Sequence, residues 1–265
     1  MQSNNNILQI ENLSKYFGGL AAVSNCSLEI KKGSITGIIG PNGSGKTTLF
    51  NLIAGNLKTS KGTVIFNNEN ITDVPSYELF SKGLLRTFQI AHEFTNLTVL
   101  ENLMMVPGNQ SGENLMNALL KPSLIKKEED QIRKKAYEVI DFLNLKHLAN
   151  ELAGNLSGGQ KKLLELGRTM MVEAKLVLLD EVGAGVNRTL LKDLGTAILR
   201  LNKEKGYTFC MIEHDMDFIS RMCDPVIVMS EGSVLFQGNP NEVKKNEKVI
   251  ESYLGRANTI NGDNN

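Results

Sequence analysis

The residues best able to do chemistry form a glycine-rich run, 40–47, between an apolar segment, Ile35–Ile39, and a segment of helical composition, Thr48–Ala54. The run consists of Gly40, Pro41, Asn42, Gly43, Ser44, Gly45, Lys46 and Thr47. Glycines let successive backbone N–H groups turn inward toward phosphate oxygens, and the following helix N-terminus adds the positive end of its dipole. Strand, loop and helix in this order are the setting of a phosphate-binding P-loop. The run therefore predicts a nucleotide phosphate site rather than a simple glycine-rich turn.

Three side chains of this region have predicted roles of their own. Lys46 is expected to reach the β- and γ-phosphates of the nucleotide. Thr47 offers a hydroxyl to Mg²⁺, which prefers hard oxygen ligands and keeps most of its water molecules. Thr48 begins the expected helix and, like the loop residues, is predicted to contact the nucleotide. A nucleotide bound with Mg²⁺ is therefore the predicted ligand.

Asp180 and Glu181 follow another continuously apolar segment, Leu176–Leu179. Strands that are apolar throughout are typical of parallel sheets covered on both faces, and ligands bind at the carboxyl ends of such strands. Asp180 is expected to hold Mg²⁺ through water. Glu181, one residue further on, is placed to orient and deprotonate an attacking water, as hydrolysis requires. An isolated Asp-Glu pair is usually only a polar strand end, so this assignment depends on the phosphate loop upstream.

His214 follows a strand-like segment, Thr208–Ile212, and Glu213. An imidazole at a strand end can hydrogen-bond a γ-phosphate and so respond to its presence. Taken alone, the residue is better explained as a capping or buried structural histidine. His92 and His147 lack this setting and are expected to be loop or surface residues.

A second candidate anion site precedes an expected helix, Lys161–Met171. Its residues are Leu156, Ser157, Gly158, Gly159 and Gln160, or LSGGQ. A serine and two glycines at a helix N-terminus suit an anion. The two N-termini can act on one nucleotide only if they approach each other. The simplest arrangement is two subunits head to tail, with each phosphate loop opposite the partner's LSGGQ, and this predicts a dimer.

The elements that must position these residues predict an α/β fold. Alternating or β-branched segments at Ile7–Leu13, Ala22–Ile30 and Thr63–Asn67 predict an antiparallel flank, and the continuously apolar segments predict a parallel central sheet. Lys126–Leu145 has apolar residues at helical spacing and predicts an amphipathic surface helix. The segment 106–121 predicts a loop with one short helix at 113–120.

Composition narrows the function further. The 265 residues include 29 Lys+Arg and 29 Asp+Glu, so the formal net charge is +0 and nucleic acid is not an expected partner. Cys26, Cys210 and Cys223 form no CxxC pair, which fits a reducing compartment better than a disulfide framework or a zinc site. No apolar run approaches the roughly 20 residues of a membrane helix, and Met1–Asn6 lacks the features of a secretory signal. We therefore expect an intracellular chain that does not span a bilayer.

Over residues 7–255 the order of these motifs resembles that of the ATP-binding cassette (ABC) ATPases. The resemblance implies a P-loop NTPase fold with ATP and Mg²⁺ as ligands. It implies that Asp180 and Glu181 form the Walker B end and that His214 is the switch histidine. It also implies that Gln89 joins the ATP core to a helical subdomain, as a catalytic residue and a Mg²⁺ ligand.

An adenine contact and a domain division follow from the same resemblance. Phe17 and Tyr16 are both candidates for the ring that stacks on adenine, and the position before Gly18 favours Phe17. The ATP-binding core is expected at residues 1–85 and 157–255, with a helical subdomain inserted at 86–156 and a disordered tail at 256–265. Within the insert, Phe94 and Leu97 are expected either in the core or in an apolar groove that accepts a helix of a membrane partner.

Three further segments, 83–89, 98–103 and 184–187, are similar to those of branched-chain amino-acid importer ATP-binding subunits. This implies an ATPase that energises transport through separate transmembrane permease subunits, with a solute-binding protein as an indirect partner. Its place would be the inner, cytoplasmic face of the membrane, and its partner cassette an identical copy or a paralogue. Uptake of urea or other amides, export of lipopolysaccharide, a soluble ABC ATPase and a module without catalysis remain alternatives.

One position departs from the family pattern. Where these proteins usually read Asp-Glu-Pro, the chain has Val182 after Glu181. Proline fixes φ near −65°, so its absence is expected to loosen the turn that holds Glu181 and to slow hydrolysis. Gly183 adds further backbone freedom.

Overall fold

The structure, a computed structural model, describes residues 5–87, 93–108 and 110–260. Contacts divide the chain into two compact units, each assembled from separate segments. The first unit comprises Met1–Arg86, Lys175–Gly183 and Leu199–Asn265, and the second comprises Thr87–Ala174 and Ala184–Ile198.

A six-stranded, largely parallel sheet forms the centre of the first unit. The strand order is β10-β9-β3-β8-β7-β6, and only β10 pairs antiparallel, with β9. The strands are β3 (Ile35–Ile39), β6 (Leu84–Arg86), β7 (Leu176–Asp180), β8 (Thr208–Ile212), β9 (Val226–Ser230) and β10 (Ser233–Gly238). Every residue of β3, β7 and β8 is buried, as their continuously apolar sequences predict. The predicted parallel sheet is therefore confirmed.

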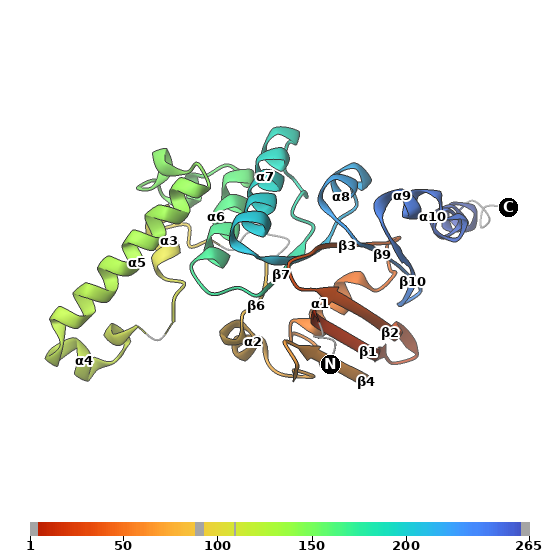
Figure 1. Cartoon of the computed structure of the whole chain (residues 1–265), viewed down its shortest axis with the longest axis horizontal. Coiled ribbons are helices and arrows are strands. Elements are labelled where there is room, and N and C mark those ends of the chain that lie inside the picture. Colours follow the sequence, from red (N-terminus) through yellow and green to blue (C-terminus); the bar gives the residue numbers. More distant parts are fainter. Residues whose placement is uncertain (1–4, 88–92, 109, 261–265) are drawn as a thin grey trace. The chain divides into compact units, whose positions relative to one another are not determined.

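The predicted antiparallel flank is the second sheet of this unit, with the strand order β2-β1-β4-β5. Figure 1 shows β1, β2 and β4 of this sheet. Its strands are β1 (Asn6–Phe17), β2 (Leu20–Lys31), β4 (Lys61–Phe66) and β5 (Glu69–Asn70). Ile10 of β1, Phe50 of helix α1 and Ile38 of β3 belong to one buried cluster. The helix that follows the glycine-rich loop is therefore held by apolar contacts shared with both sheets.

The helices of the first unit follow or cap these strands. They are α1 (Lys46–Ile53), α2 (Ser76–Lys82), α8 (Met216–Met222), α9 (Pro240–Lys245) and α10 (Glu247–Ile260). The backbone of α10 continues to Ile260, into the segment 256–265 for which the sequence predicts a tail. Residues 261–265 lie outside the described part of the chain.

The second unit is mainly helical. It contains α3 (Val99–Met104), α4 (Leu115–Leu120), α5 (Pro122–Phe142) and α6 (Gly158–Met170), three short 3-10 turns, η1 (Ser111–Glu113), η2 (Lys146–Leu148) and η3 (Ala153–Asn155), and the first part of α7 (Arg188–Lys205). Because Gly167 of α6 has no side chain, α6 packs closely against α3 and the end of α5. A Cβ at this position would lie 2.8 Å from Leu143, 3.1 Å from Val139 and 3.3 Å from Leu103.

The sequence misplaces the starts of two helices of this unit. Helix α6 begins at Gly158 and not at the predicted Lys161. Helix α5 begins at Pro122, before the start that the sequence predicts at Lys126. Proline is accepted in the first helical turn because its missing N–H group would have no partner there, and its fixed φ suits a helix.

The predicted domain division stays a prediction, and the compact units differ from it in two segments of the expected core, 157–174 and 184–198, which belong to the second unit. Residues 157–174 fall in the second unit, because α6 contacts α3 and α5. Within the described residues, no helix is both long and apolar enough to cross a membrane.

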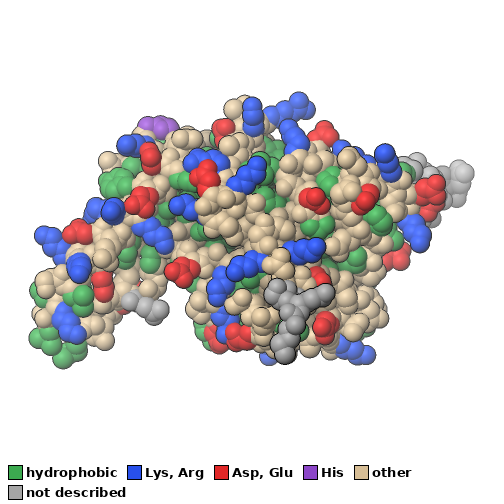
Figure 2. All heavy atoms as spheres, viewed as in Figure 1, with side chains coloured by type: hydrophobic (Ala, Val, Ile, Leu, Met, Phe, Trp, Pro, Cys, Tyr) green, Lys and Arg blue, Asp and Glu red, His purple; other side chains and the backbone are tan. Residues whose placement is uncertain are grey.

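Apolar side chains gather over α4, as Figure 2 shows in green. They include Leu115, Met116, Leu119 and Leu120, all strongly exposed.

Candidate functional site

The glycine-rich loop has a backbone that only glycine adopts easily. Gly40, Gly43 and Gly45 have φ angles of 150°, 76° and 98°, respectively. A Cβ on Gly40 would lie 2.1 Å from the Met229 carbonyl oxygen, and one on Gly45 would lie 2.4 Å from that of Ala22. The loop runs from β3 into α1, whose N-cap is Gly45. Conformation favours glycine at all three positions, and lack of space requires it at Gly40 and Gly45. The result is the strand–loop–helix predicted for a phosphate site.

Lys46 is held over the loop from which it projects. Its side chain is buried, and Nζ donates to the carbonyl oxygens of Gly40 at 2.8 Å and Pro41 at 3.0 Å. Asn42 and Gly43 of the loop are exposed, as is Thr47 in the first turn of α1. The ammonium group is therefore held at the loop by backbone carbonyls, while Asn42, Gly43 and Thr47 remain accessible to solvent.

Asp180 ends β7 with its side chain almost fully buried. Its Oδ2 accepts from Arg86 Nη2 at 2.6 Å, and Arg86 Nη1 donates to Asn51 Oδ1 at 2.5 Å. A buried carboxylate needs such a partner, because desolvation of an unpaired charge is costly. Sequence reasoning missed Arg86, because no local pattern shows that β6 pairs with β7.

Glu181 occupies the turn just after β7, with a backbone φ of 49°. This left-handed conformation costs a non-glycine residue roughly 1–2 kcal/mol. Its N–H donates to the Ile212 carbonyl at 2.9 Å, and its Oε1 lies 3.0 Å from His214 Nε2. The structure thus brings together the two residues that the sequence marks as base and γ-phosphate sensor.

Glu213 is a third acidic residue at this site, and sequence reasoning did not name it as a candidate. Its side chain is buried and its Oε1 accepts from the Gly183 N–H at 2.8 Å. Burial raises the pKa of the Glu213 carboxyl, while backbone hydrogen bonds from Gly183 and His214 oppose this shift. The available signal was a carboxylate directly after the apolar strand β8, where burial of a charge is unfavourable unless the charge is hydrogen-bonded or paired.

The candidate adenine ring lies in the β1–β2 hairpin. Phe17 and Tyr16 are 46% and 40% exposed, so either ring is free to stack on a base. Lys15 Nζ lies 5.2 Å from the centroid of the Phe17 ring, a cation–π arrangement. The choice between Phe17 and Tyr16 stays open.

The LSGGQ segment belongs to the second unit and begins α6. Ser157 is the N-cap and forms a capping box with Gln160, whose Oε1 accepts from the Ser157 N–H at 2.9 Å. Ser157 and Gly158 are exposed, whereas Gly159 is buried. A Cβ on Gly159 would lie 2.4 Å from Leu190 Cδ1, so a larger residue would push α6 away from α7.

Two further predictions concern the start of the second unit. Gln89 lies outside the described residues. Phe94 is about half exposed, and the centroid of its ring lies 5.7 Å from the Arg168 guanidinium carbon. Leu97 is half-buried. The apolar groove predicted from Phe94 and Leu97 stays a prediction.

The donor set fits Mg²⁺ held largely by phosphate and water. Thr47 offers an exposed hydroxyl, and Asp180 keeps Oδ1 as well as the Oδ2 that Arg86 contacts. The described residues contain no group of three or more His, Cys, Asp or Glu side chains able to hold a metal. Mg²⁺ in nucleotide sites characteristically uses one or two protein oxygens rather than a closed protein cage.

The cysteines have no place in this chemistry. Cys26, Cys210 and Cys223 are free and buried. Burial raises the pKa of all three thiols, that of Cys26 to about 12, so the nucleophilic thiolate form is suppressed.

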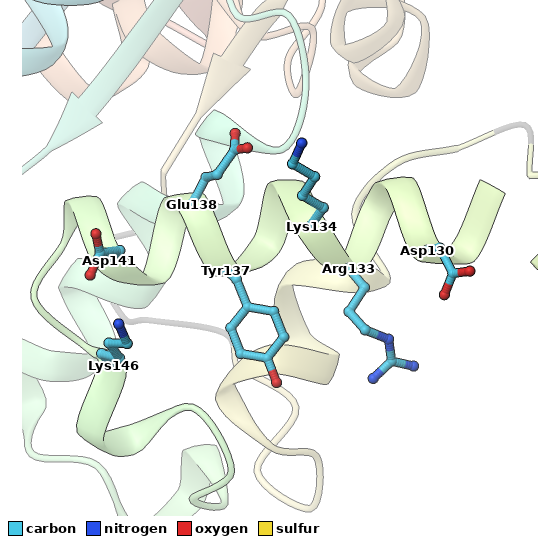
Figure 3. A pocket seen from close by; sticks show the side chains of 7 residues that line it. All are labelled: Asp130, Arg133, Lys134, Tyr137, Glu138, Asp141 and Lys146. Carbon is cyan, nitrogen blue, oxygen red and sulfur yellow. The ribbon is translucent and has the colours of Figure 1, made fainter. Parts of the chain in front are cut away.

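A polar groove along α5 carries no comparable site. Figure 3 shows Lys134 and Glu138 pointing to one side of the helix, whereas Arg133 and Tyr137 point to the other. The side chains do not converge on one point. They form the solvated face expected for an amphipathic surface helix.

Comparison with known proteins decides the family. A family profile described as ABC transporter matches residues 23–184. The chain belongs to the ABC transporter family. It is 43% identical to a probable branched-chain amino acid transport ATP-binding protein LivG of Archaeoglobus fulgidus, over 94% of this chain and 95% of that protein. It is 34% identical to the high-affinity branched-chain amino acid transport ATP-binding protein BraF of Pseudomonas aeruginosa, over 95% and 98%.

Solved structures agree with this assignment. The ADP conformation of an ATP-binding cassette of an ABC transporter has a TM-score of 0.80 and 40% identity, covering 94% of this chain and 99% of that one. A dimeric post-hydrolysis state of another cassette, bound to ADP and Pi, has a TM-score of 0.71 and 26% identity, covering 88% and 98%. The predicted ABC ATPase fold and the ATP-hydrolysing activity of a transport subunit are confirmed.

Proposed function

We propose that this cassette energises the uptake of branched-chain or related amino acids through separate membrane subunits. The observation that carries its chemistry is the Glu181–His214 pair at the carboxyl ends of β7 and β8. In the same sheet β8 also neighbours β3, which leads into the phosphate loop. The supports for the cargo are the LivG and BraF relatives and the resemblance of the 83–89, 98–103 and 184–187 segments.

The catalytic assignment gives each residue one task. The loop amides and Lys46 bind the phosphates, and Phe17 stacks on the base. Glu181 accepts a proton from the attacking water, and His214 hydrogen-bonds the γ-phosphate. Thr47 and Asp180, the latter through water, would hold Mg²⁺, with Gln89 as a further ligand. When bound, Mg²⁺ neutralises charge on the phosphates.

We infer that the active form is a dimer. Ser157, Gly158, Gly159 and Gln160 of one cassette would complete the nucleotide site at the partner's phosphate loop. A likeness to a dimeric cassette bound to ADP and Pi supports this arrangement. Binding of two ATP molecules would close the dimer, and hydrolysis would release it.

The separate permease subunits would carry the solute across the membrane, and this chain would supply the energy of ATP hydrolysis. The permease would bind near the Gln89 segment, in the groove predicted from Phe94 and Leu97, at the cytoplasmic face of the membrane. A solute-binding protein would act on the permease and affect this chain only indirectly.

The test is purification of the tagged cassette from its native membranes, followed by reconstitution of the complex in proteoliposomes. ATP-dependent accumulation of leucine, isoleucine or valine is the expected result, with the Lys46→Ala complex as the matched inactive control. Accumulation of urea instead, or outward movement of lipopolysaccharide, would overturn the cargo while leaving the ATPase intact.

A further inference from the structure

Three consecutive residues at the end of β8 hold the turn that carries Glu181. The Ile212 carbonyl accepts from the Glu181 N–H at 2.9 Å, and His214 Nε2 lies 3.0 Å from Glu181 Oε1. Between them in sequence, Glu213 Oε1 accepts from the Gly183 N–H at 2.8 Å. All these atoms belong to the first unit. The turn is thus fixed at its beginning, at its side chain and at its end.

Of the three groups that contact this turn, the Glu213 side chain is the most unusual, because it is a buried carboxylate. The residue is only 5% exposed, and burying a carboxylate is unfavourable unless it is hydrogen-bonded. The bond it makes goes to the backbone of a glycine, which has no side chain with which to anchor itself. Glu181 adopts its left-handed φ of 49° two residues before that anchor. A restraint on Gly183 therefore limits how far the Glu181 backbone can relax.

We propose that Glu213 is a positioning residue for ATP hydrolysis, which acts by fixing Gly183 and thereby the direction of the Glu181 carboxylate. This inference rests on the role proposed for Glu181. In this role Glu213 acts on the backbone of Gly183 rather than on the nucleotide or the water, so its removal should misdirect the Glu181 carboxylate and leave nucleotide binding in place.

The experiment measures steady-state ATP hydrolysis and equilibrium ATP binding of the full chain. In Glu213→Ala the acceptor is lost, and kcat falls about 10- to 100-fold while KM for ATP stays within about twofold. Glu213→Gln keeps an oxygen at the same reach, so kcat stays within about threefold of the wild type. Glu213→Asp keeps the charge but loses one methylene of reach, and we expect it to behave like the alanine variant.

Two controls separate positioning from stability. Glu242→Ala removes another carboxylate that accepts from a backbone amide, the Asn239 N–H at 2.9 Å in the α9 cap, and should leave kcat unchanged. In a Glu181→Gln background, Glu213→Ala should lower the residual rate no further, because Glu213 acts through Glu181. Thermal melting of each variant shows that the rates refer to folded protein.

A rescue sharpens the test. Val182→Pro stiffens the same turn by another route, so it should restore part of the kcat lost in Glu213→Ala. Unchanged kcat in the folded Ala and Asp variants, or equal losses with and without Glu181, would overturn the inference alone. Normal hydrolysis by Glu181→Gln would instead remove the proposed role of Glu181, and the inference with it.

Discussion

The loop before α1 and the turn before α6 each present a helix N-terminus, and they satisfy their backbone groups in different ways. The loop has no side-chain cap, since its N-cap is Gly45, and its lysine is already bound to loop carbonyls. The turn before α6 closes on itself through the Ser157–Gln160 capping box. We therefore expect the loop before α1 to bind phosphate within one chain.

The difference predicts that the 40–47 loop binds phosphate by itself and that the LSGGQ turn does not. A capping box satisfies two of the free N–H groups at the start of a helix, so fewer remain for an anion. The lysine that directly follows the second turn, Lys161, is paired with Glu93 at 2.6 Å, whereas Lys46 donates to carbonyls of its own loop. We therefore expect LSGGQ to contribute only to a nucleotide that the partner cassette already holds.

The largest effect should come from the loop. Lys46→Ala leaves the carbonyls of Gly40 and Pro41 without their donor and removes the cation for the phosphates, so ATP binding should weaken at least about 100-fold, roughly 2.7 kcal/mol. Calorimetric titration measures this, with exposed Lys32→Ala as the control. Retained binding would mean that the loop amides suffice to hold ATP, and Lys46 would then not be what distinguishes the phosphate loop from the LSGGQ turn.

Glu181→Gln tests whether both turns hold one nucleotide. The change keeps both N-termini intact and removes the base, so kcat should fall about 10³-fold while ATP binding persists. With ATP and Mg²⁺ the variant should migrate as a dimer in size-exclusion chromatography and small-angle scattering. A monomer saturated with ATP would contradict the head-to-tail arrangement.

Ser157→Ala isolates the second turn. Loss of the cap should cost about 1 kcal/mol of stability, and loss of a hydroxyl at the partner's phosphates should lower kcat about tenfold or more. ATP binding to the single cassette should not change.

Thr98→Ala is the matched control, since Thr98 forms the same kind of capping box with Glu101 at the start of α3 in the same unit. It should show the stability loss without the loss in kcat. Equal kcat in both variants would reduce Ser157 to a helix cap.

The smallest effect should come from Val182→Pro. A proline whose φ fits the turn stabilises by about 0.4–1 kcal/mol and should preserve or modestly raise ATP hydrolysis. Paired measurements of melting temperature and kcat check this. A large loss of kcat in folded protein would show that rigidity is not what this turn lacks.

Much of the site was readable because its determinants are local. The glycines of 40–47 and the apolar segments 35–39 and 176–179 dictate a strand, a phosphate loop and a buried parallel sheet through steric and burial rules that act over a few residues. The Ser157–Gln160 capping box was equally local, and the serine three residues before a glutamine was its available signal.

The tertiary structure alone decided which of these residues meet. Arg86 pairs with Asp180 across 94 positions of the chain, and His214 reaches Glu181 across 33. Both contacts follow from the strand order β3-β8-β7-β6, which no local pattern specifies. The role proposed for Glu213 likewise depends on β8 lying beside β7, because parallel pairing brings the end of one strand to the turn after the other.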